Sequence, residues 1–273
     1  MGIVLGIDVG GSTTKVVGYR DTEMIGTRQV RAADQITSLF GAIGNFLREY
    51  NVQLSEVSKI ALTGVGASFI DEPIYGIDTQ KINEFQAIGQ GALLLSGLKE
   101  AIVVSMGTGT AFVRASSDGI SHLGGSGVGG GTIIGIASKM IGKSDIDAIL
   151  DLAKTGKLEN VDLSVRDIIG QEMPSLPLNL TAANFGKIRS TASEADLALG
   201  IINMVFQTAG MLAVFVARND NIKDVLLTGT LTMFPQAESV QAAFSSFTDL
   251  RFSIPPNAVF ATAAGAASIL IKN

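Results

Sequence analysis

The sequence predicts an α/β protein of two lobes, and two observations carry this prediction. Residues 3–7 and 16–19 are short β-branched runs bounded by glycine, as the strands of a hairpin are. The same order of strand, glycine-threonine turn and strand recurs at residues 101–115. A repeat of this kind, by pattern and not by identity, indicates that two similar units make up the chain.

The first unit alternates strands with helices. A third strand is expected at 24–30, and apolar residues at helical spacing predict a helix over 33–50. A strand over 57–62 then runs into a glycine-bearing loop at Thr63 and Gly64. Ligands of α/β folds bind at the carboxyl edge of the sheet, so this loop is a candidate binding segment, although an ordinary connection has the same composition.

The turn of the first hairpin has the composition of a phosphate-binding loop. The residues from Gly10 to Thr13 are glycines and hydroxyl residues, which let backbone N–H groups approach a phosphate without a Cβ in the way. Asp8 can hold Mg²⁺, because this ion prefers few carboxylates together with phosphates, and Lys15 adds a positive charge. A tight hairpin without any ligand is the alternative interpretation of this stretch alone.

The second unit repeats this arrangement. A strand over 101–105 leads into the turn from Gly107 to Gly109, and further strands are expected up to residue 115 and near 119–123. Two glycine-lined hairpins would clamp a nucleotide from both sides, which is a more specific pattern than either turn alone.

Two further glycine segments follow the second hairpin. Residues 123–132 are the most glycine-dense stretch, and they lead into an apolar helical segment over 133–141. An anion site at a helix N-terminus is favoured here over a flexible linker. A strand at 224–227 ends in a third glycine-hydroxyl turn, which contains Gly229 and Thr230.

Asn83 and Glu84 begin a predicted helix that runs to about residue 98. Asparagine is a good N-cap, and an acidic residue suits the first turn of a helix. From position alone, an ordinary helix-start glutamate is therefore the favoured interpretation.

Composition excludes several classes of protein. The net charge is −5 and there is no basic run, which argues against nucleic acid as a partner. The chain has no cysteine, so a disulfide framework, a thiolate zinc site and an iron–sulfur cluster are excluded. No secretory signal is visible near residue 1, and a cytoplasmic location is expected.

One long apolar segment raises the question of a membrane. Residues 197–217 carry no charge, but they contain Asn203, Gln207 and Thr208, and charged residues bracket them closely. A buried core or interface helix over 193–218 is favoured over a membrane span. Because this helix is apolar nearly all round, we expect a homodimer interface and no membrane partner.

The ordered motifs resemble those of a known superfamily. Asp-x-Gly-Gly near the start, Met-Gly-Thr-Gly-Thr in the middle and Thr-Gly-Thr late in the chain resemble the phosphate-1, phosphate-2 and adenosine motifs of actin-like ATPases and sugar kinases. Within that superfamily the chain resembles type II pantothenate kinases from end to end. The most specific motif is Leu-Thr-Ala-Ala-Asn-Phe-Gly at residues 180–186.

The resemblance implies a two-lobed actin-like ATPase fold of the ribonuclease H-like kind, with the nucleotide in the cleft. Each lobe would be a mixed sheet flanked by helices, with the N-terminal lobe over residues 1–99 and the C-terminal lobe over 100–273. It also implies ATP-dependent phosphorylation of the terminal hydroxyl of pantothenate, the first step of coenzyme A biosynthesis. ATP and Mg²⁺ would be the cofactors, and the partner would be a small-molecule substrate.

By similarity, Glu84 is the general base that takes the hydroxyl proton, and Asp8 positions Mg²⁺. The residues expected to bind the nucleotide are Asp8, Val9, Gly10, Gly11, Ser12, Thr13, Thr14, Lys15, Gly107, Thr108, Gly109, Gly129, Gly130, Gly131, Thr132, Ile133, Ile134, Gly229 and Thr230. The residues expected near the acceptor substrate are Thr63, Gly64, Ala111, His122 and Gly124.

Two positions depart from the family's pattern. Ala111 stands where the family usually has serine, and His122 stands where it usually has arginine. Both positions are associated in the family with the carboxylate end of the acceptor. An arginine binds a carboxylate through two parallel hydrogen bonds, and a histidine near neutral pH replaces it poorly. Pantetheine, which lacks that carboxylate, is therefore an alternative acceptor; the other interpretation is that neighbouring residues hold pantothenate.

Other activities of the same superfamily are the remaining alternatives. A kinase for a sugar is disfavoured by the motif at 180–186, and the superfamily members with zinc or iron–sulfur sites need cysteines. An actin-like ATPase without an acceptor would not need Glu84. Replacement of this residue therefore distinguishes the two classes: ATP binding should survive while phosphoryl transfer is lost.

Overall fold

The computed structural model describes residues 2–32, 34–169, 177–178 and 180–271. Ala33, the first residue of the helix predicted over 33–50, lies outside these ranges. The strands are β1 (Ile3–Val9), β2 (Thr13–Arg20), β3 (Glu23–Arg31), β4 (Val57–Thr63), β5 (Asp78–Lys81), β6 (Glu100–Met106), β7 (Thr110–Ser116), β8 (Gly119–Ser126), β9 (Leu163–Ser164), β10 (Thr181–Ala183), β11 (Asp224–Thr228) and β12 (Arg251–Ser253). The α-helices are α1 (Gln35–Glu49), α2 (Glu84–Ser96), α3 (Gly130–Met140), α4 (Ile146–Ala153), α5 (Val165–Ile168), α6 (Glu194–Asn219), α7 (Pro235–Phe247) and α8 (Ala261–Ile271).

The two large sheets have the same topology. The first has the order β3-β2-β1-β4-β5, and the second, read from its opposite edge, has the order β8-β7-β6-β11-β12. In each sheet the first three strands form an antiparallel meander, and two parallel strands are added beside the first strand of that meander. The predicted repeat is therefore confirmed, and it extends beyond the hairpins to the whole sheet.

Helices cover both faces of the first sheet. The residues of β1 alternate: Ile3, Leu5 and Ile7 pack towards α1, whereas Val4 packs in a second cluster with α8. All three of these side chains on the α1 face are fully buried, which is typical of a central strand covered on both sides.

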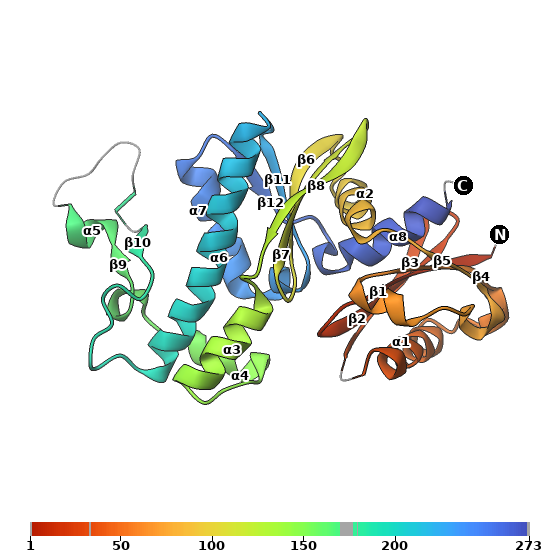
Figure 1. Cartoon of the computed structure of the whole chain (residues 1–273), viewed down its shortest axis with the longest axis horizontal. Helices are drawn as coiled ribbons and strands as arrows, with labels where there is room; N and C mark the ends of the chain where they lie inside the picture. Colours follow the sequence, from red (N-terminus) through yellow and green to blue (C-terminus); the bar gives the residue numbers. More distant parts are fainter. Residues whose placement is uncertain (1, 33, 170–176, 179, 272–273) are drawn as a thin grey trace.

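Helices α2 and α8 lie between the two sheets (Figure 1). They pack unusually closely, because glycines stand where the backbones meet. A Cβ added at Gly91 would lie 1.8 Å from the carbonyl oxygen of Ala261, and one added at Gly265 would lie 1.9 Å from that of Ala87. The small residues of α8 thus allow one layer to serve both lobes.

Helix α8 packs on β1, β4 and β2 of the first sheet, although its residues fall in the range predicted for the second lobe. By its contacts this late segment belongs with the first lobe. The helix α2 packs on β6, β7 and β8 of the second sheet through Ile88 and Ala92.

The second lobe has its own core on the far face of its sheet. Helix α6 runs along this face and packs against α3, α4 and α7 (Figure 1). It is the one helix in the described ranges that is long and apolar enough to cross a membrane, and half of its apolar window is buried inside the structure. The outer surface of α6 leaves Met211, Leu212 and Phe215 partly exposed.

The motif at residues 180–186 forms strand β10 and the turn after it, and it surrounds the buried carboxylate of Asp162. Asn203 of α6 donates to Asp162 Oδ2 over 2.8 Å, and the backbone N–H of Phe185 donates to Oδ1 over 2.9 Å. Thr181 adds a hydroxyl bond to the same carboxylate at 3.2 Å. The motif therefore fastens a peripheral segment to α6.

Candidate active site

A cavity of about 1010 Å³ lies between the two sheets and is lined by the glycine turns of both hairpins. Fifteen of the residues singled out from the sequence line it: Asp8, Gly10, Gly11, Ser12, Thr13, Lys15, Glu84, Gly107, Thr108, Gly109, Ala111, Gly130, Ile134, Gly229 and Thr230. These residues come from segments as much as 222 positions apart in the sequence (230 − 8), so the fold gathers them around one space.

The first hairpin places its turn at the edge of this cavity. Asp8 pairs with Lys15 across the β1–β2 ladder, and the N–H of Gly10 donates to the carbonyl of Thr13 over 3.0 Å to close the turn. A Cβ on Gly10 would lie 2.9 Å from that carbonyl, so the tight closure requires glycine there.

The turn of the second hairpin is also closed by a backbone hydrogen bond, and the glycine-rich segment packs against this turn. The N–H of Gly107 donates to the carbonyl of Gly109 over 2.8 Å. The N–H groups of Gly130 and Gly131 donate to the carbonyls of Gly107 and Thr108 over 2.8 and 2.9 Å. A Cβ on Gly129 would lie 2.6 Å from the carbonyl of Thr108, which explains why glycines are needed in this segment.

This geometry changes the interpretation of the start of α3. The sequence favours an anion site made by N–H groups at this helix N-terminus, but the structure shows that Gly130 and Gly131 already use theirs to hold the second hairpin. Gly129 likewise donates to the hydroxyl of Thr132 over 3.1 Å. The segment therefore contributes the surfaces of Gly130 and Ile134 to the cavity.

The two hairpin turns touch each other. Ser12 Oγ of the first lobe lies 3.2 Å from Thr108 Oγ1 of the second. A Cβ on Gly11 would lie 3.5 Å from the same threonine hydroxyl. Both turns thus face one space.

Three charged side chains, those of Asp8, Lys15 and Glu84, line this space. Lys15 Nζ lies 3.5 Å from Asp8 Oδ2, and both residues are nearly buried, with 6% and 8% exposed. Glu84 is the first residue of α2, which is capped by Asn83 through bonds from the N–H groups of Phe85 and Gln86. Burial, and then the negative charge of Asp8, raises the pKa of Glu84, while Lys15 opposes the shift.

The third glycine turn has a counterpart in the first lobe. Gly229 follows β11 and Gly64 follows β4, and both have φ of +89°, a conformation that favours glycine. A Cβ on Gly229 would lie 2.6 Å from the carbonyl of Met106, and one on Gly64 would lie 2.5 Å from Asp8 Oδ1. Gly64 thus supports Asp8 from behind and does not itself line the cavity.

The other predicted residues do not line the cavity. The side chains of Val9 and Ile133 are buried in the hydrophobic cores of the two lobes, and those of Thr14 and Thr63 are fully buried. The remaining members of this group are Gly64, His122, Gly124, Gly129, Gly131 and Thr132.

His122 lies one layer behind the cavity wall. Its ring stacks on Phe85, with ring centroids 3.8 Å apart and planes 13° from parallel. Phe85 follows Glu84 and itself lines the cavity. His122 therefore contacts the cavity wall through Phe85.

Several lining residues were not predicted from the sequence. They include Arg31, Val65, Phe85, Ser126, Asp145, Phe234 and Val259. The position of Asp145 before an apolar run is typical of a helix N-cap, so a local pattern could have indicated that role. No local pattern shows that this residue faces the end of β3. Arg31 and Asp145 are 114 positions apart, so only the closure of the two lobes brings them together.

Comparison with known proteins now identifies the family. The model of the Fumble family matches residues 98–246, which is 149 of 273 residues and more than half of the chain. The chain belongs to the Fumble family. The match covers the second hairpin, the glycine-rich segment and the motif at 180–186, so it includes most of the second lobe.

Curated relatives match over almost the whole chain. The type II pantothenate kinase of Staphylococcus aureus (strain USA300) is 28% identical over 275 residues, which covers 96% of this chain and 97% of that protein. The type II pantothenate kinase of Bacillus cereus (strain G9842) is 25% identical over 260 residues, covering 92% of this chain and 91% of that protein. The resemblance stated from the motifs is thereby confirmed, and so is the expected enzyme class, a phosphotransferase with an alcohol acceptor.

Solved structures confirm the predicted actin-like fold. Component A of the (R)-2-hydroxyglutaryl-CoA dehydratase of Acidaminococcus fermentans superposes with a TM-score of 0.70 at 17% identity, and the match covers 100% of this chain and 98% of that one. The activator of the 2-hydroxyisocaproyl-CoA dehydratase of Clostridium difficile, a structure with bound ADPNP, gives a TM-score of 0.69 at 13% identity, covering 99% and 94%. At these identities the likeness concerns the fold alone.

Proposed function

We propose that this chain is an ATP-dependent kinase that phosphorylates the terminal hydroxyl of a pantothenate-type acceptor. The observation that carries the proposal is the placement of Glu84 in the same cavity as both glycine hairpins, beside Asp8 and Lys15. The names of the curated relatives support this acceptor class.

The residues around the hairpins fit a nucleotide triphosphate with magnesium. Ser12, Thr13 and Thr108 supply hydroxyl groups, and Lys15 supplies a buried positive charge. The described residues contain no group of three or more metal-ligating side chains, but Mg²⁺ on a nucleotide needs only one or two carboxylates, and Asp8 provides one. Bound there, the ion would neutralise negative charge on the phosphates.

Glu84 is suited to the role of general base. A base must lie near the acceptor hydroxyl and must have a pKa close enough to the working pH to take up a proton. Burial and Asp8 raise the pKa of Glu84, which makes its carboxylate more basic than one in water. Asn83 caps the helix that Glu84 begins, which fixes the backbone at this position. In the reaction, the proton of the acceptor alcohol would pass to Glu84 as the alcohol oxygen attacks the terminal phosphorus of ATP and ADP leaves.

One observation favours pantetheine over pantothenate as the acceptor. The lysine and arginine side chains that line the described part of the cavity are Lys15 and Arg31, and both already pair with aspartates. Ala111 offers no polar atom in its side chain, and the ring of His122 is stacked on Phe85. An acceptor whose far end is a neutral amide and thiol suits this wall better than one that ends in a carboxylate.

We further propose that the enzyme acts in the cytoplasm as a homodimer. The exposed apolar side chains of Met211, Leu212 and Phe215 on α6 form the surface that a second copy would cover. The measurement is the mass in solution: a dimer that dissociates in the Phe215→Glu variant supports the proposal, and a monomeric wild type overturns it.

An ATP-consumption screen tests the reaction itself. Purified protein is mixed with ATP and Mg²⁺ and with pantothenate, pantetheine or a set of sugars, and ADP release is followed. Turnover with pantetheine above that with pantothenate is expected. Equal or better turnover of pantothenate would overturn the preference, and turnover of a sugar alone would overturn the kinase assignment to this acceptor class.

A further inference from the structure

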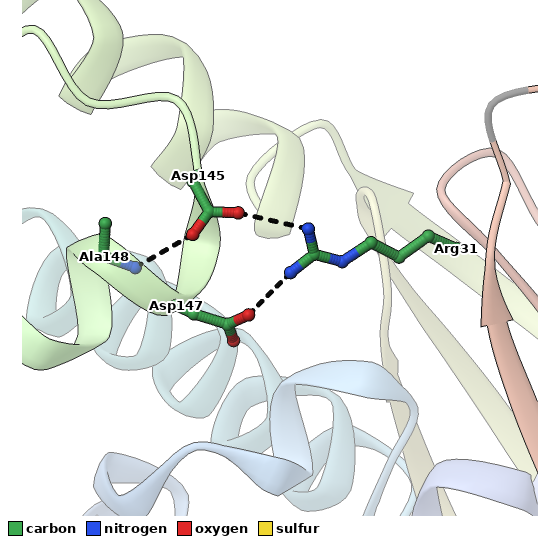
Figure 2. A network of polar contacts seen from close by, with 4 residues as sticks. All are labelled: Arg31, Asp145, Asp147 and Ala148. Atoms are coloured by element: carbon green, nitrogen blue, oxygen red, sulfur yellow. Dashed lines mark hydrogen bonds and ion pairs between the residues drawn. The ribbon is translucent and has the colours of Figure 1, made fainter.

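Arg31 joins the two lobes at the rim of the cavity. It is the last residue of β3 in the first lobe, and its guanidinium reaches two carboxylates at the start of α4 in the second lobe (Figure 2). Arg31 Nη1 donates to Asp145 Oδ1 over 3.2 Å, and Nη2 donates to Asp147 Oδ2 over 2.6 Å. Arg31 and Asp145 themselves line the cavity.

The two ends of this contact are fixed by their own lobes. On the first lobe, Arg31 pairs with Thr13 in the β2–β3 ladder, so its backbone adjoins the turn of the first hairpin. On the second lobe, Asp145 is the N-cap of α4, and its other carboxylate oxygen accepts the N–H of Ala148 over 3.1 Å (Figure 2). Because the cap already orders the Asp145 side chain, little entropy is lost when it also binds the guanidinium.

The contact lies away from the layer that joins the lobes elsewhere. Helices α2 and α8 pack together between the sheets (Figure 1). Arg31 bridges instead from the C-terminal end of the edge strand β3 to the start of α4 (Figure 2). If the lobes hinge about the α2–α8 layer, an ion pair at this rim would limit how far they separate.

We propose that Arg31, with Asp145 and Asp147, is a latch that holds the two lobes closed over the nucleotide cavity. Arg31 is a positioning residue: when the latch is closed, it keeps the first hairpin and the start of α4 on opposite walls of the same space. Release of nucleotide requires the ion pairs to break. The nucleotide part of this inference rests on the proposed function, whereas the closure of the lobes does not.

The solvent exposure of the three charged side chains sets how strongly the latch can hold the lobes together. The side chains are 70%, 52% and 71% exposed for Arg31, Asp145 and Asp147, so water and salt weaken each pair. Exposed pairs contribute up to about 1 kcal/mol, which corresponds to about a fivefold change in the opening equilibrium. A latch of this strength opens readily, so it slows the release of nucleotide without preventing it.

The first test measures the distance between the lobes without any nucleotide. The chain has no cysteine, so the Thr37→Cys and Ser138→Cys substitutions, at exposed positions of α1 and α3, accept two spin labels and no other site reacts. Arg31→Gln should add a population with a longer distance, and high salt should do the same to the wild type. The matched control is Arg28→Gln, which removes the same charge from the same strand but breaks a pair with Glu49 inside the first lobe.

The second test measures release of a fluorescent ATP analogue by stopped flow. Arg31→Gln, which breaks both pairs, should speed release about fivefold or more, and Asp147→Asn, which leaves the pair with Asp145, should have a smaller effect in the same direction. The double variant should add little to Arg31→Gln, because Asp147 acts through Arg31. Asp145→Ser, which keeps a capping side chain, should act in the same direction, and Arg31→Lys should fall between wild type and Arg31→Gln.

Unchanged lobe distances and unchanged release in Arg31→Gln would overturn the latch. Equal effects of Arg31→Gln and Arg28→Gln would also overturn it, because a general loss of charge would then explain the result. A wild type that binds no ATP analogue would remove the proposed function, and the distance measurement would still decide the latch.

Discussion

The hydroxyl oxygens of Ser12 and Thr108 lie 3.2 Å apart, although the two residues belong to different lobes and are 96 positions apart in sequence. Each sits at the turn of a hairpin in the same place within its sheet, since β1–β2 and β6–β7 are equivalent in the two topologies. The repeated fold thus brings two equivalent turns face to face at one cavity.

Thr108→Val should weaken ATP binding while leaving the fold intact. The substitution removes a hydroxyl and keeps the shape, and a hydrogen bond to a charged group contributes about 1.5–3 kcal/mol. We therefore expect the KM for ATP to rise about tenfold or more, with a smaller change in kcat. Steady-state kinetics at saturating acceptor measure this.

Thr108→Ser and Ser116→Ala are the controls for that experiment. The first keeps the hydroxyl, and the second removes a hydroxyl from the far end of β7, where it donates to the carbonyl of Gly119. Both should retain the wild-type KM for ATP, and a Thr108→Val enzyme with the same KM would show that this turn does not hold the phosphates.

Glu84→Gln should strongly slow phosphoryl transfer without affecting ATP binding. Loss of a general base lowers kcat by about 10²–10⁴-fold. Because the pKa of Glu84 is raised, the wild-type rate should fall on the acid side at a pH above the ordinary range of a glutamate, and this limb should disappear in the variant. A pH profile of kcat with pantetheine measures both effects.

The same substitution should stabilise the fold at neutral pH. A raised pKa means that the folded protein resists ionisation of Glu84, so the stabilising contribution of the neutral group is complete at low pH and is lost as the pH rises through the raised pKa. Urea unfolding should therefore show Glu84→Gln to be more stable than wild type at pH 8, with a smaller difference at pH 4. Glu159→Gln, at an exposed position, serves as the control.

Gly265→Ala should destabilise the whole protein, whereas Gly44→Ala should stabilise it slightly. The new Cβ at residue 265 would lie 1.9 Å from the carbonyl of Ala87, so α2 and α8 would have to separate, at a cost of about 3 kcal/mol or more. At Gly44 in α1 no atom lies within 4 Å of the new Cβ, and the gain is about 0.5–1 kcal/mol. Thermal unfolding of both variants measures the contrast, and equal stabilities would contradict the close packing of these helices.

Asp162→Ala should unfold the peripheral segment without changing the cavity. The substitution leaves Asn203, Thr181 and the N–H of Phe185 without their acceptor, and such losses cost about 1–3 kcal/mol each. We expect a stability loss of about 3 kcal/mol overall and an unchanged KM for ATP at low temperature. An altered KM in a fully folded variant would show that the motif at 180–186 takes part in binding, and Asp118→Ala is the exposed control.

Local patterns predicted the parts of the fold that local forces determine. The two hairpins, the helix that begins after Asn83 and the third glycine turn were all predicted from short segments, because strand composition, caps and positive-φ glycines act within a few residues. The repeated sheet could be predicted for the same reason, since each copy carries its own signals.

Contacts between distant segments were beyond such patterns. No spacing rule shows that Arg31 faces Asp145, or that α8 returns to cover the first sheet. The composition of the glycine-rich segment predicts an anion-binding site at a helix N-terminus. Only the structure shows that the N–H groups of Gly130 and Gly131 donate to carbonyls of the second hairpin. Composition predicts that N–H groups are available, whereas tertiary structure decides what they bind.

The position of α8 also has a consequence for synthesis on the ribosome. The first sheet is translated early, but the helix that covers one of its faces comes from residues 261–271. Val4, Val17 and Ala61 therefore remain without this cover until residues 261–271 have emerged. During that interval the nascent first lobe exposes an apolar face, the kind of surface through which incompletely folded chains aggregate.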